Sequence, residues 1–213
     1  MVNNKKEIQF WQTPQTVANI RVLLEKNQVV LSSTDTVLGL LAPVTRQGFE
    51  LLDSIKQRSK KPYLVLIGSA EFLTEFIDPI SDFHIENLIN NCWPGPLTLI
   101  FKAKASLPEF IKGAQGTIAL RVPDHAQLRQ LAIHFHGLFS TSANIAHQPV
   151  PTRMTDVDPE ILSAVAAWVD DANHENIDVA STILDCSTGT ISVVRPGAYP
   201  IEVLENKAGV KFS

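Results

Sequence analysis

Residues 45–69, TRQGFELLDSIKQRSKKPYLVLIGS, place a helical pattern directly before a strand-like one, with a basic cluster between them. Apolar residues recur every three positions from Phe49 to Ile55, which is the spacing of one face of a helix, and Thr45 is suited to cap its N-terminus. Residues 63–69 form a short, continuous apolar run, which is typical of a strand buried on both faces. This order of elements predicts an α/β fold.

The rest of the chain repeats this alternation of helices and strands. Further helices are predicted at 14–26, 70–77, 83–92, 125–135 and 160–173. Further strands are predicted at 28–34, 96–103, 117–123, 138–142, 181–187 and 190–195. The last two strands form a hairpin around a turn at 187–189, so we expect a mixed parallel and antiparallel sheet with helices on both faces. We expect one α/β domain over residues 1–213.

The composition is that of a globular protein, with 45% apolar and 19% charged residues in 213 positions. A net charge of −4 argues against a protein whose whole surface binds nucleic acid. Cys92 and Cys186 have neither metal-ligand nor disulfide-framework spacing, so we expect buried thiols in a reducing compartment. The sequence shows no signal peptide and no membrane-spanning run, and we expect a cytoplasmic protein.

The basic cluster contains Lys56, Arg58, Lys60 and Lys61, four of the 18 lysines and arginines of the chain. Basic side chains at a helix C-terminus offset the helix dipole by about 0.3–1 kcal/mol each. They would equally suit the phosphates of RNA or a clamp for a small anion. The dipole or plain solvation accounts for Lys60, whereas the pattern leaves the role of Lys56 and Arg58 open.

Small hydroxyl, amide, acidic and basic side chains gather in and after the predicted strands. They are Thr34, Asp35, Thr36, Thr117, Arg121, Ser140, Thr141, Ser142, Asn144, Ser181, Thr182 and Arg195. Ligands of open α/β sheets bind beyond the strand ends, but hydroxyl residues are also common in turns because they bond their own backbone. Arg121 and Arg195 are stronger candidates, because an arginine beside apolar strand residues needs an anionic partner, either a protein carboxylate or a ligand.

The usual nucleotide-binding and hydrolase motifs do not occur in the sequence. It contains neither a GxxxxGK[ST] phosphate loop nor a GxGxxG loop, and it has no GxSxG nucleophile elbow. The six histidines have no zinc-ligand spacing. No metal held by protein side chains is therefore predicted.

Six motifs, the last of them made of two segments, occur in the same order as in the YrdC/TsaC family, the threonylcarbamoyl-AMP synthases, and resemble its motifs. Residues 56–62 (KQRSKKP) resemble the family's lysine–arginine signature that closes on Lys-Pro, and residues 33–40 (STDTVLGL) resemble its PT[DE]TVYGL. The other segments are WPGPLTL (93–99), ALRVPDH (119–125), STSAN (140–144) and the closing pair STILD (181–185) and VVRPGA (193–198). The matches span about residues 28–198 and resemble the short, single-domain form of the family.

The resemblance implies a twisted, mixed β-sheet flanked by helices, with a central, concave and positively charged cavity. It implies a reaction in which L-threonine, bicarbonate and ATP give threonylcarbamoyl-AMP and pyrophosphate, with Mg²⁺ accompanying ATP. Separate threonylcarbamoyl transferase proteins would use the product to modify tRNA at position 37.

The resemblance also implies roles for individual residues. Lys56 and Arg58 are the expected catalytic residues and also contact the nucleotide. The expected threonine and bicarbonate site comprises Thr34, Lys61, Arg121, Ser140 and Ser181. The expected nucleotide site adds Thr117, Ser142, Asn144 and Arg195. Adenylation places negative charge on the α-phosphate and on the departing pyrophosphate, and cationic side chains stabilise that charge.

Three positions depart from the family pattern, because Ser33, Leu38 and His147 replace a proline, a tyrosine and a glycine. The loss of the tyrosine at Leu38 is expected to change the border of the substrate pocket. His147 is expected to change a turn that favours positive φ.

Two alternative functions stay open. One is a paralogue similar to the YciO branch, with the same fold and altered activity, although this chain keeps the lysine–arginine and SAN motifs that the branch usually lacks. The other is an RNA-binding factor in rRNA maturation, with a weak RNA contact at 56–61, but the acidic balance and the lack of interleaved aromatic residues argue against it. The related domain of a carbamoyl-transferring hydrogenase maturation protein is disfavoured, because its acylphosphatase and zinc-finger segments are absent.

Overall fold

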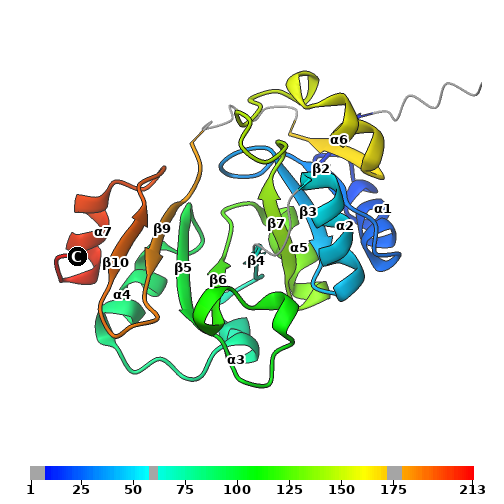
Figure 1. Ribbon diagram of the computed structural model, residues 1–213. Helices are drawn as coiled ribbons and strands as arrows, with labels where there is room; N and C mark the ends of the chain where they lie inside the picture. Colours follow the sequence, from blue (N-terminus) through cyan, green and yellow to red (C-terminus); the bar gives the residue numbers. More distant parts are fainter. Residues whose placement is uncertain (1–7, 58–61, 172–178) are drawn as a thin grey trace, which may run out of the picture.

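A computed structural model describes residues 8–57, 62–171 and 179–213, which form one ten-stranded sheet with helices packed against it (Figure 1). The strands are β1 (Ile8–Phe10), β2 (Val30–Ser32), β3 (Gly39–Pro43), β4 (Leu64–Leu66), β5 (Leu97–Lys102), β6 (Thr117–Arg121), β7 (Leu138–Ser142), β8 (Ala167–Asp170), β9 (Thr182–Asp185) and β10 (Ser192–Arg195). Their order across the sheet is β1-β8-β2-β3-β7-β4-β6-β5-β9-β10. The pairs β1/β8, β2/β8, β4/β6 and β5/β9 are parallel and the others antiparallel, so the predicted mixed sheet and its closing hairpin are confirmed.

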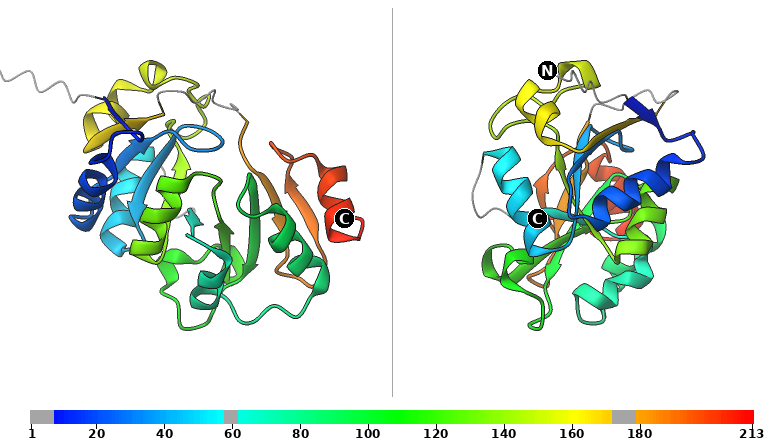
Figure 2. Two further views of the ribbon diagram at one scale, coloured as in Figure 1. Left: turned by 180° about the vertical axis from the view of Figure 1, so that it is seen from behind. Right: turned by 90° about the vertical axis from the view of Figure 1, so that its right-hand side faces the viewer.

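Helices cover both faces of the sheet, as predicted. The described residues contain α1 (Thr16–Glu25), α2 (Arg46–Lys56), α3 (Leu73–Phe76), α4 (Phe83–Cys92), α5 (Ala126–Phe135), α6 (Pro159–Ala164) and α7 (Ile201–Ala208). Short 3-10 helices lie at Ala70–Phe72, Glu109–Ile111, Ala114–Gly116 and Met154–Asp156. Figure 2 shows α1 and α5 together on one face and α2 and α6 on the other.

The sheet separates two hydrophobic cores. Leu40 and Leu41 are neighbours on β3, so their side chains point to opposite faces, and both are fully buried. Leu41 belongs to the cluster that contains Leu24 of α1 and Leu128 of α5, and Leu40 belongs to the cluster that contains Leu52 of α2. Burying each of these leucines contributes about 1.5–3 kcal/mol. Two apolar faces per strand explain the continuous apolar runs in the sequence.

Helix α2 begins and ends as its sequence predicts. Oγ1 of Thr45, the N-cap, accepts the backbone N–H of Gly48 at 3.0 Å. Gln57, with a positive φ of 49°, ends the helix. Lys56 is only 2% exposed, so the first residue of the basic cluster lies inside the protein rather than in solvent.

The predicted helix at 160–173 is wrong from Val165 onward, as far as the structure describes that segment. Helix α6 ends at Ala164, and strand β8 lies between β1 and β2. Alternate residues of β8, Ala167 and Val169, are buried, which is the two-residue period of a strand. Backbone pairing with two neighbouring strands therefore outweighs the helix propensity of the alanines.

Strand β3 is not predicted by the sequence pattern, and neither are β1 and α7. Gly39 and Pro43, which bound β3, are uncommon inside strands and conceal it. It nevertheless lies near the centre of the sheet, between β2 and β7, and all its residues are buried. This strand carries the loop 33–38 to the side of β7, where the candidate site lies.

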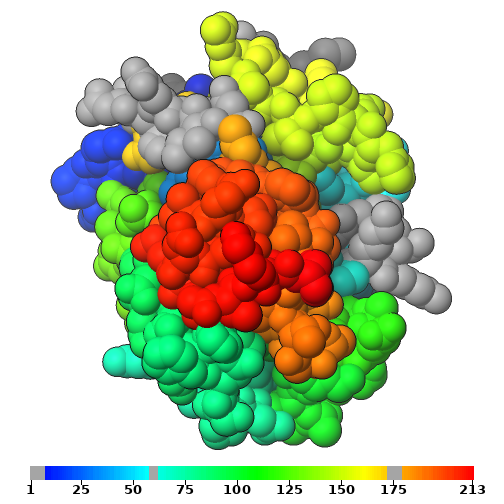
Figure 3. Space-filling view, turned by 90° about the vertical axis from the view of Figure 1, so that its left-hand side faces the viewer, coloured from blue at the N-terminus to red at the C-terminus, as the bar shows by residue number. Residues whose placement is uncertain are grey.

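The C-terminal elements close one end of the molecule. Figure 3 shows α7 at the surface beside β9 and β10, with the segment around α4 directly below it in that view. Nδ1 of His84 lies 2.8 Å from the backbone O of Ala208, and Nζ of Lys207 donates to the backbone O of Asn91 at 2.8 Å. These contacts anchor the chain that follows β10, the strand that ends with Arg195.

Both cysteines are buried and free, as predicted. Burial raises the pKa of the Cys186 thiol to about 12 and also raises the pKa of Cys92, so both thiols are uncharged at neutral pH. None of the helices in the described ranges is long and apolar enough to cross a membrane.

Candidate active site

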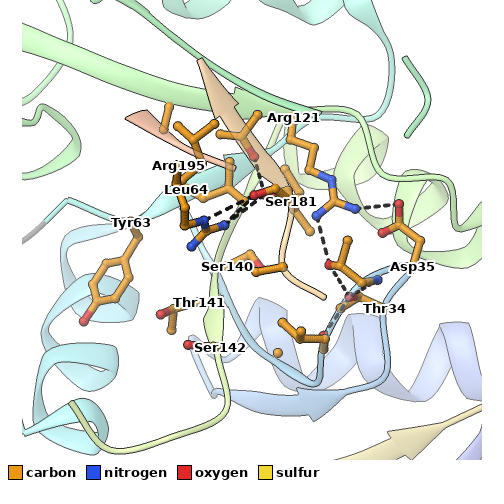
Figure 4. A pocket seen from close by; sticks show the side chains of 18 of the residues that line it. Thr34, Asp35, Tyr63, Leu64, Arg121, Ser140, Thr141, Ser142, Ser181 and Arg195 are labelled. Atoms are coloured by element: carbon orange, nitrogen blue, oxygen red, sulfur yellow. Dashed lines mark hydrogen bonds and ion pairs between the residues drawn. The ribbon is translucent and has the colours of Figure 1, made fainter. Parts of the chain in front are cut away.

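A cavity of about 340 Å³ lies against the central strands (Figure 4). It is lined by Thr34, Asp35, Thr36, Val37, Gly39, Pro62, Tyr63, Leu64, Leu66, Thr98, Ala119, Arg121, Ser140, Thr141, Ser142, Ala180, Ser181, Ile183 and Arg195. Six residues with a predicted site role are among them, namely Thr34, Arg121, Ser140, Ser142, Ser181 and Arg195. Strands β3, β4, β5, β6, β7, β9 and β10 all contribute, so the fold brings together residues that are far apart in the sequence.

The cavity is lined by residues just outside the strands, as expected, and also by residues on one face of the strands. The first kind includes residues 34–37 after β2, and Ala180 and Ser181 before β9. Residues two apart on a strand point to the same face, and both Ala119 and Arg121 of β6 line the cavity. Ser140 of β7 also lines it, and Leu138, two residues earlier, packs in the core of α1 and α5. These strand residues therefore line the cavity from the face of the sheet that carries α1 and α5.

Arg121 is surrounded by protein oxygens and is only 3% exposed. Its Nε donates to the backbone O of Gly95 at 3.0 Å, and its Nη1 donates to Oγ1 of Thr36 at 3.0 Å. Its Nη2 lies 2.6 Å from Oδ2 of Asp35. Burial lowers the pKa of the Arg121 guanidinium, and the carboxylate of Asp35 opposes that shift. Of the two kinds of anionic partner that the sequence allowed, the structure provides a protein carboxylate.

Arg195 is exposed, and among the described residues its guanidinium is held by Ser181. Its Nε and Nη2 donate to the backbone O of Ser181 at 3.3 and 2.7 Å, and Nη2 also lies 3.4 Å from Oγ of that residue. No carboxylate of the described residues forms an ion pair with Arg195. Partial burial lowers the pKa of the Arg195 guanidinium, and the positive charge of Arg121 lowers it further.

The charge of the described lining comes from Asp35, Arg121 and Arg195. Because Asp35 neutralises Arg121, the net positive charge of this lining lies at Arg195. An anionic group of a ligand is therefore favoured beside Arg195.

The loop between β2 and β3 presents Thr34 to the cavity. Oγ1 of Thr34 donates to the backbone O of Val37 at 2.8 Å and accepts the backbone N–H of Thr36 at 3.1 Å. Side-chain bonds of this kind stabilise turns. The hydroxyl therefore shapes its own loop, and the loop holds Thr36 against Arg121.

Hydroxyl groups also line the wall formed by β5, β7 and the start of β9. Oγ of Ser181 lies 2.8 Å from Oγ1 of Thr98. Oγ of Ser142 donates to Oδ1 of Asn144 at 2.5 Å. Ser181, which accepts from Arg195, thus offers a hydroxyl beside that guanidinium, and Ser142 offers another on the β7 wall of the cavity.

Lys56 lies behind the cavity lining. Its Nζ donates to the backbone O of Ser142 at 2.6 Å, to Oδ1 of Asn144 at 3.0 Å and to the backbone O of Asn144. An ammonium group has three N–H donors, and these three acceptors match them. Lys56 thus holds the turn after β7, and its predicted catalytic role stays a prediction.

Thr117 and Asn144 also lie outside the lining. Oγ1 of Thr117 donates to the backbone O of Ala114 at 3.0 Å, in the turn before β6. Nδ2 of Asn144 donates to the backbone O of Gln148 at 2.6 Å. Both side chains stabilise local turns, and their predicted nucleotide contacts stay predictions.

Arg58 and Lys61 lie outside the described residues, so their predicted roles are untested. The described chain resumes at Pro62 and Tyr63, which both line the cavity. The phenol of Tyr63 donates to Oδ1 of Asp53 at 2.6 Å and thereby ties this wall to α2. The basic cluster is therefore followed directly in the sequence by two residues of the cavity lining, Pro62 and Tyr63.

The three departures from the family pattern leave the described lining intact. Leu38 is 1% exposed and packs in the core that contains α2, so the expected change of the pocket border is wrong. His147 has a φ of 70°, the positive value that the replaced glycine would favour, so this turn is kept. The backbone N–H of Ser33 donates to the backbone O of Val169 at 2.9 Å, a bond that proline cannot make.

Several lining residues carry no predicted role. Asp35 and Thr36 are candidates in the sequence without an assigned role, whereas Tyr63 and Thr98 are not singled out there. Thr98 lies in the WPGPLTL segment, whose Gly95 accepts a hydrogen bond from Arg121. The match of this segment to the family motif was therefore the sequence feature that could have indicated Thr98 as a cavity residue.

Comparison with known proteins identifies one family. The Sua5/YciO/YrdC family model, described as telomere recombination, matches residues 22–197. A threonylcarbamoyl-AMP synthase of Bacillus subtilis is 32% identical over 199 residues, which cover 91% of this chain and 56% of that protein. A threonylcarbamoyl-AMP synthase of Pyrococcus abyssi is 27% identical over 98% of this chain and 61% of that protein. The chain thus spans less than two thirds of the length of these relatives.

Solved structures share the fold described above. Pyrococcus abyssi Sua5 complexed with L-threonine has a TM-score of 0.82 and 27% identity, and the match covers 92% of this chain and 58% of that one. Escherichia coli YciO, with a TM-score of 0.74 and 18% identity over 92% of this chain and 98% of that one, shows the fold alone. With its mixed sheet, its six motifs and the family match over residues 22–197, the chain belongs to the Sua5/YciO/YrdC family.

Proposed function

We propose that this chain is a threonylcarbamoyl-AMP synthase, a nucleotidyltransferase that forms threonylcarbamoyl-AMP and pyrophosphate from L-threonine, bicarbonate and ATP. The observation that carries the proposal is the cavity of about 340 Å³, in which two arginines and several hydroxyl groups face one space. The names of the B. subtilis and P. abyssi relatives support it, as does the L-threonine in the P. abyssi complex.

The threonine site in this proposal lies beside Thr34 and Arg121, with the guanidinium facing the carboxylate of the amino acid. Nη1 of Arg121 carries two N–H groups, and the bond to Thr36 uses one of them, so the other suits a ligand oxygen. Ser140 and Ser181 line the space that threonine and bicarbonate share. Hydroxyl groups suit both substrates because they donate and accept hydrogen bonds.

The nucleotide site lies on the side of Arg195, Ser142, Asn144 and Thr117. The positive charge of Arg195 has no carboxylate partner among the described residues, which favours a phosphate group there. Ser142 lines the cavity, whereas Asn144 and Thr117 contribute through the turns that they stabilise.

Lys56 and Arg58 are the proposed catalytic cations, and Lys61 is proposed to contact the threonine and bicarbonate side. The contacts of Lys56 with Ser142 and Asn144 place its charge directly behind the proposed nucleotide wall. Bidentate geometry suits Arg58 for the phosphates. The predicted anion clamp thus combines a buried ammonium with side chains that follow it in the sequence.

The chemistry needs no nucleophile from the protein. The amine of threonine attacks the carbon of bicarbonate, water leaves, and a carbamate forms. A carbamate oxygen then attacks the α-phosphorus of ATP, and the bond from this phosphorus to pyrophosphate breaks. Placing the reactants side by side and stabilising the negative charge that moves onto pyrophosphate lower the barrier.

Mg²⁺ is proposed to arrive with ATP. Within the described ranges, no three His, Cys, Asp or Glu side chains form a group that would hold a metal ion. Asp35, the carboxylate of the described lining, is engaged by Arg121. The donors that suit Mg²⁺ here are therefore phosphate oxygens and water.

The product is proposed to pass to tRNA-modifying threonylcarbamoyl transferase proteins, which modify position 37 of tRNA. We place the reaction in the cytoplasm, and the two free, buried cysteines agree with a reducing compartment.

Pyrophosphate release by the purified chain tests the proposed function. We expect release that requires both L-threonine and bicarbonate, with threonylcarbamoyl-AMP formed in equal amount. ATP hydrolysis without these co-substrates, or no turnover at all, would contradict the synthase and favour the YciO-like paralogue. Salt-sensitive binding of rRNA without turnover would favour the RNA-binding factor.

A further inference from the structure

Asp35 is a buried carboxylate at the back of the cavity, where it joins an arginine to a loop. Its Oδ2 lies 2.6 Å from Nη2 of Arg121 and accepts the backbone N–H of Asp124 at 2.7 Å. The residue is 6% exposed, and the proposed reaction gives it no contact with a substrate. Figure 4 shows its carboxylate beside the guanidinium, next to the loop that carries Thr34.

The loop that binds Asp35 is itself fixed to the rest of the fold. His125, the residue after Asp124, caps α5, because its Nδ1 accepts the backbone N–H of Leu128 at 3.3 Å. Its Nε2 lies 2.9 Å from Oδ2 of Asp171, which follows β8. Since Nδ1 accepts, Nε2 carries the proton and donates to Asp171. The backbone N–H of Asp124 is therefore a fixed donor, and it fixes the short side chain of Asp35.

Arg121 has the longer side chain of the two, with more rotamers to be excluded. Burying an arginine side chain costs up to about 2 kcal/mol of rotamer entropy. Nη2 makes no aligned hydrogen bond within the described residues, so its contact with Asp35 is an ion pair. This ion pair neutralises the guanidinium and determines where it lies. A fixed carboxylate at this point selects one conformer of the long side chain.

Stability alone does not explain this carboxylate. Oδ1 of Asp35 is buried and has no hydrogen-bond partner among the described residues. An unsatisfied buried acceptor costs about 1–3 kcal/mol, and apolar replacements of buried ion pairs are often neutral or stabilising. A residue that is costly to bury in this way points to a role in the site.

We propose that Asp35 is a positioning residue for Arg121, which neutralises the guanidinium and holds it so that Nη1 faces the carboxylate of the amino-acid substrate. This inference rests on the proposed function. The two effects of Asp35, on the charge and on the position of Arg121, predict opposite changes in threonine binding when Asp35 is removed. If only charge mattered, removing Asp35 would strengthen the binding of an anionic substrate. If position matters, removing it weakens threonine binding and spares ATP.

The test compares Asp35→Asn, which removes the charge, with Asp35→Glu, which restores it one methylene further out. Asp82→Asn is the matched control, because Asp82 also accepts backbone N–H groups but caps α4 away from the cavity. Pyrophosphate release is measured while threonine and ATP are varied separately, and L-threonine binding is measured by calorimetry. Thermal unfolding of each variant confirms that it is folded.

We expect Asp35→Asn to raise the KM for threonine at least about tenfold while the KM for ATP changes less than about threefold. Asp35→Glu should keep the KM for threonine within about threefold of wild type, and so should Asp82→Asn. An unchanged or lower threonine KM in folded Asp35→Asn would overturn the proposal, as would equal losses for threonine and ATP. If Asp35→Asn does not fold, Asp35→Glu decides, because a tenfold loss in a folded charge-restoring variant would also overturn it.

The two proposals fail in different ways. A wild-type protein that binds L-threonine without turnover contradicts the synthase, while threonine binding by the variants still tests Asp35. A wild-type protein with normal turnover and an unaffected Asp35→Asn variant contradicts only the positioning role. A wild-type protein that neither binds threonine nor turns over contradicts both.

Discussion

Arg121 and Arg195 face the same cavity, but the protein surrounds the first with its own acceptors, whereas the described residues place no carboxylate against the second (Figure 4). Arg121 is 3% exposed and contacts Gly95, Thr36 and Asp35. Arg195 is exposed and contacts only the neutral oxygens of Ser181 within the described chain. Two arginines predicted alike from the sequence therefore have different environments.

The difference suggests a division of labour in the proposed reaction. A neutralised, immobile guanidinium suits recognition of a small carboxylate, because its position is set before the substrate arrives. An uncompensated guanidinium suits phosphates, whose charge changes as pyrophosphate leaves. Substitutions test this division, because we expect a change at Arg121 to lower stability and a change at Arg195 to lower activity.

The largest effect on stability is expected at the buried arginine. Arg121→Ala leaves Asp35 buried and unpaired, so we expect the free energy of unfolding to fall by about 3–5 kcal/mol in urea denaturation. The double variant Arg121→Met with Asp35→Leu should recover most of this loss. A loss below about 1 kcal/mol in Arg121→Ala would mean that the ion pair is not buried as described.

The exposed arginine should show the opposite pattern. Arg195→Ala removes only hydrogen bonds to Ser181, so we expect at most about 1 kcal/mol of lost stability. A lost charge-assisted contact of about 2–3 kcal/mol to phosphate corresponds to a fall in kcat/KM for ATP of roughly 30- to 150-fold. Steady-state kinetics and urea denaturation of one preparation measure both. A large stability loss with unchanged ATP kinetics would remove the distinction between the two arginines.

Lys56 is a third cation that sharpens the comparison, because it is buried like Arg121 and its Nζ donates to neutral oxygens of Ser142 and Asn144. Lys56→Met keeps an unbranched side chain of similar length and removes the N–H donors to Ser142 and Asn144. We therefore expect the free energy of unfolding to fall by about 1.5–3 kcal/mol. The turn after β7 should loosen, and hydrogen exchange of its amides should increase. Unchanged protection of this turn would show that Lys56 does not hold it.

Gly39 should give the smallest effect. A Cβ at this position would lie 3.3 Å from Cγ2 of Thr34 and 3.6 Å from Oγ of Ser140. Gly39→Ala should therefore narrow the proposed threonine side with a change in stability below about 1 kcal/mol. We expect a KM for threonine that rises about two- to fivefold, with less effect on ATP. Equal effects on both substrates would place the threonine elsewhere.

The sequence predicted those features that depend on local patterns. Helix α2, its Thr45 cap and the β9–β10 hairpin follow from residue spacing and turn chemistry. Strand β8 could not be predicted in this way, because the alanines at 164, 166 and 167 favour a helix, and only pairing with β1 and β2 makes the segment 167–170 a strand. The family motifs indicated which distant segments belong to one site, which local patterns do not reveal.

The candidate site was predictable as a set of residues but not as an arrangement. The sequence indicated that Arg121 needs an anionic partner, but Asp35 is distant in the chain and only the sheet topology brings the two together. Leu38 was expected at the pocket border because the family has a tyrosine there, whereas its side chain packs in the core. Which face a loop residue presents depends on tertiary packing, and no alternation in the sequence reveals it.

A structure of the chain with L-threonine and a non-hydrolysable ATP analogue tests the central claim most directly, namely that one cavity holds both substrates between the two arginines. We predict the threonine carboxylate beside Nη1 of Arg121 and the phosphates beside Arg195, with the Asp35–Arg121 ion pair intact. Threonine or nucleotide bound outside the lining described here, or the phosphates at Arg121 and the threonine at Arg195, would contradict it.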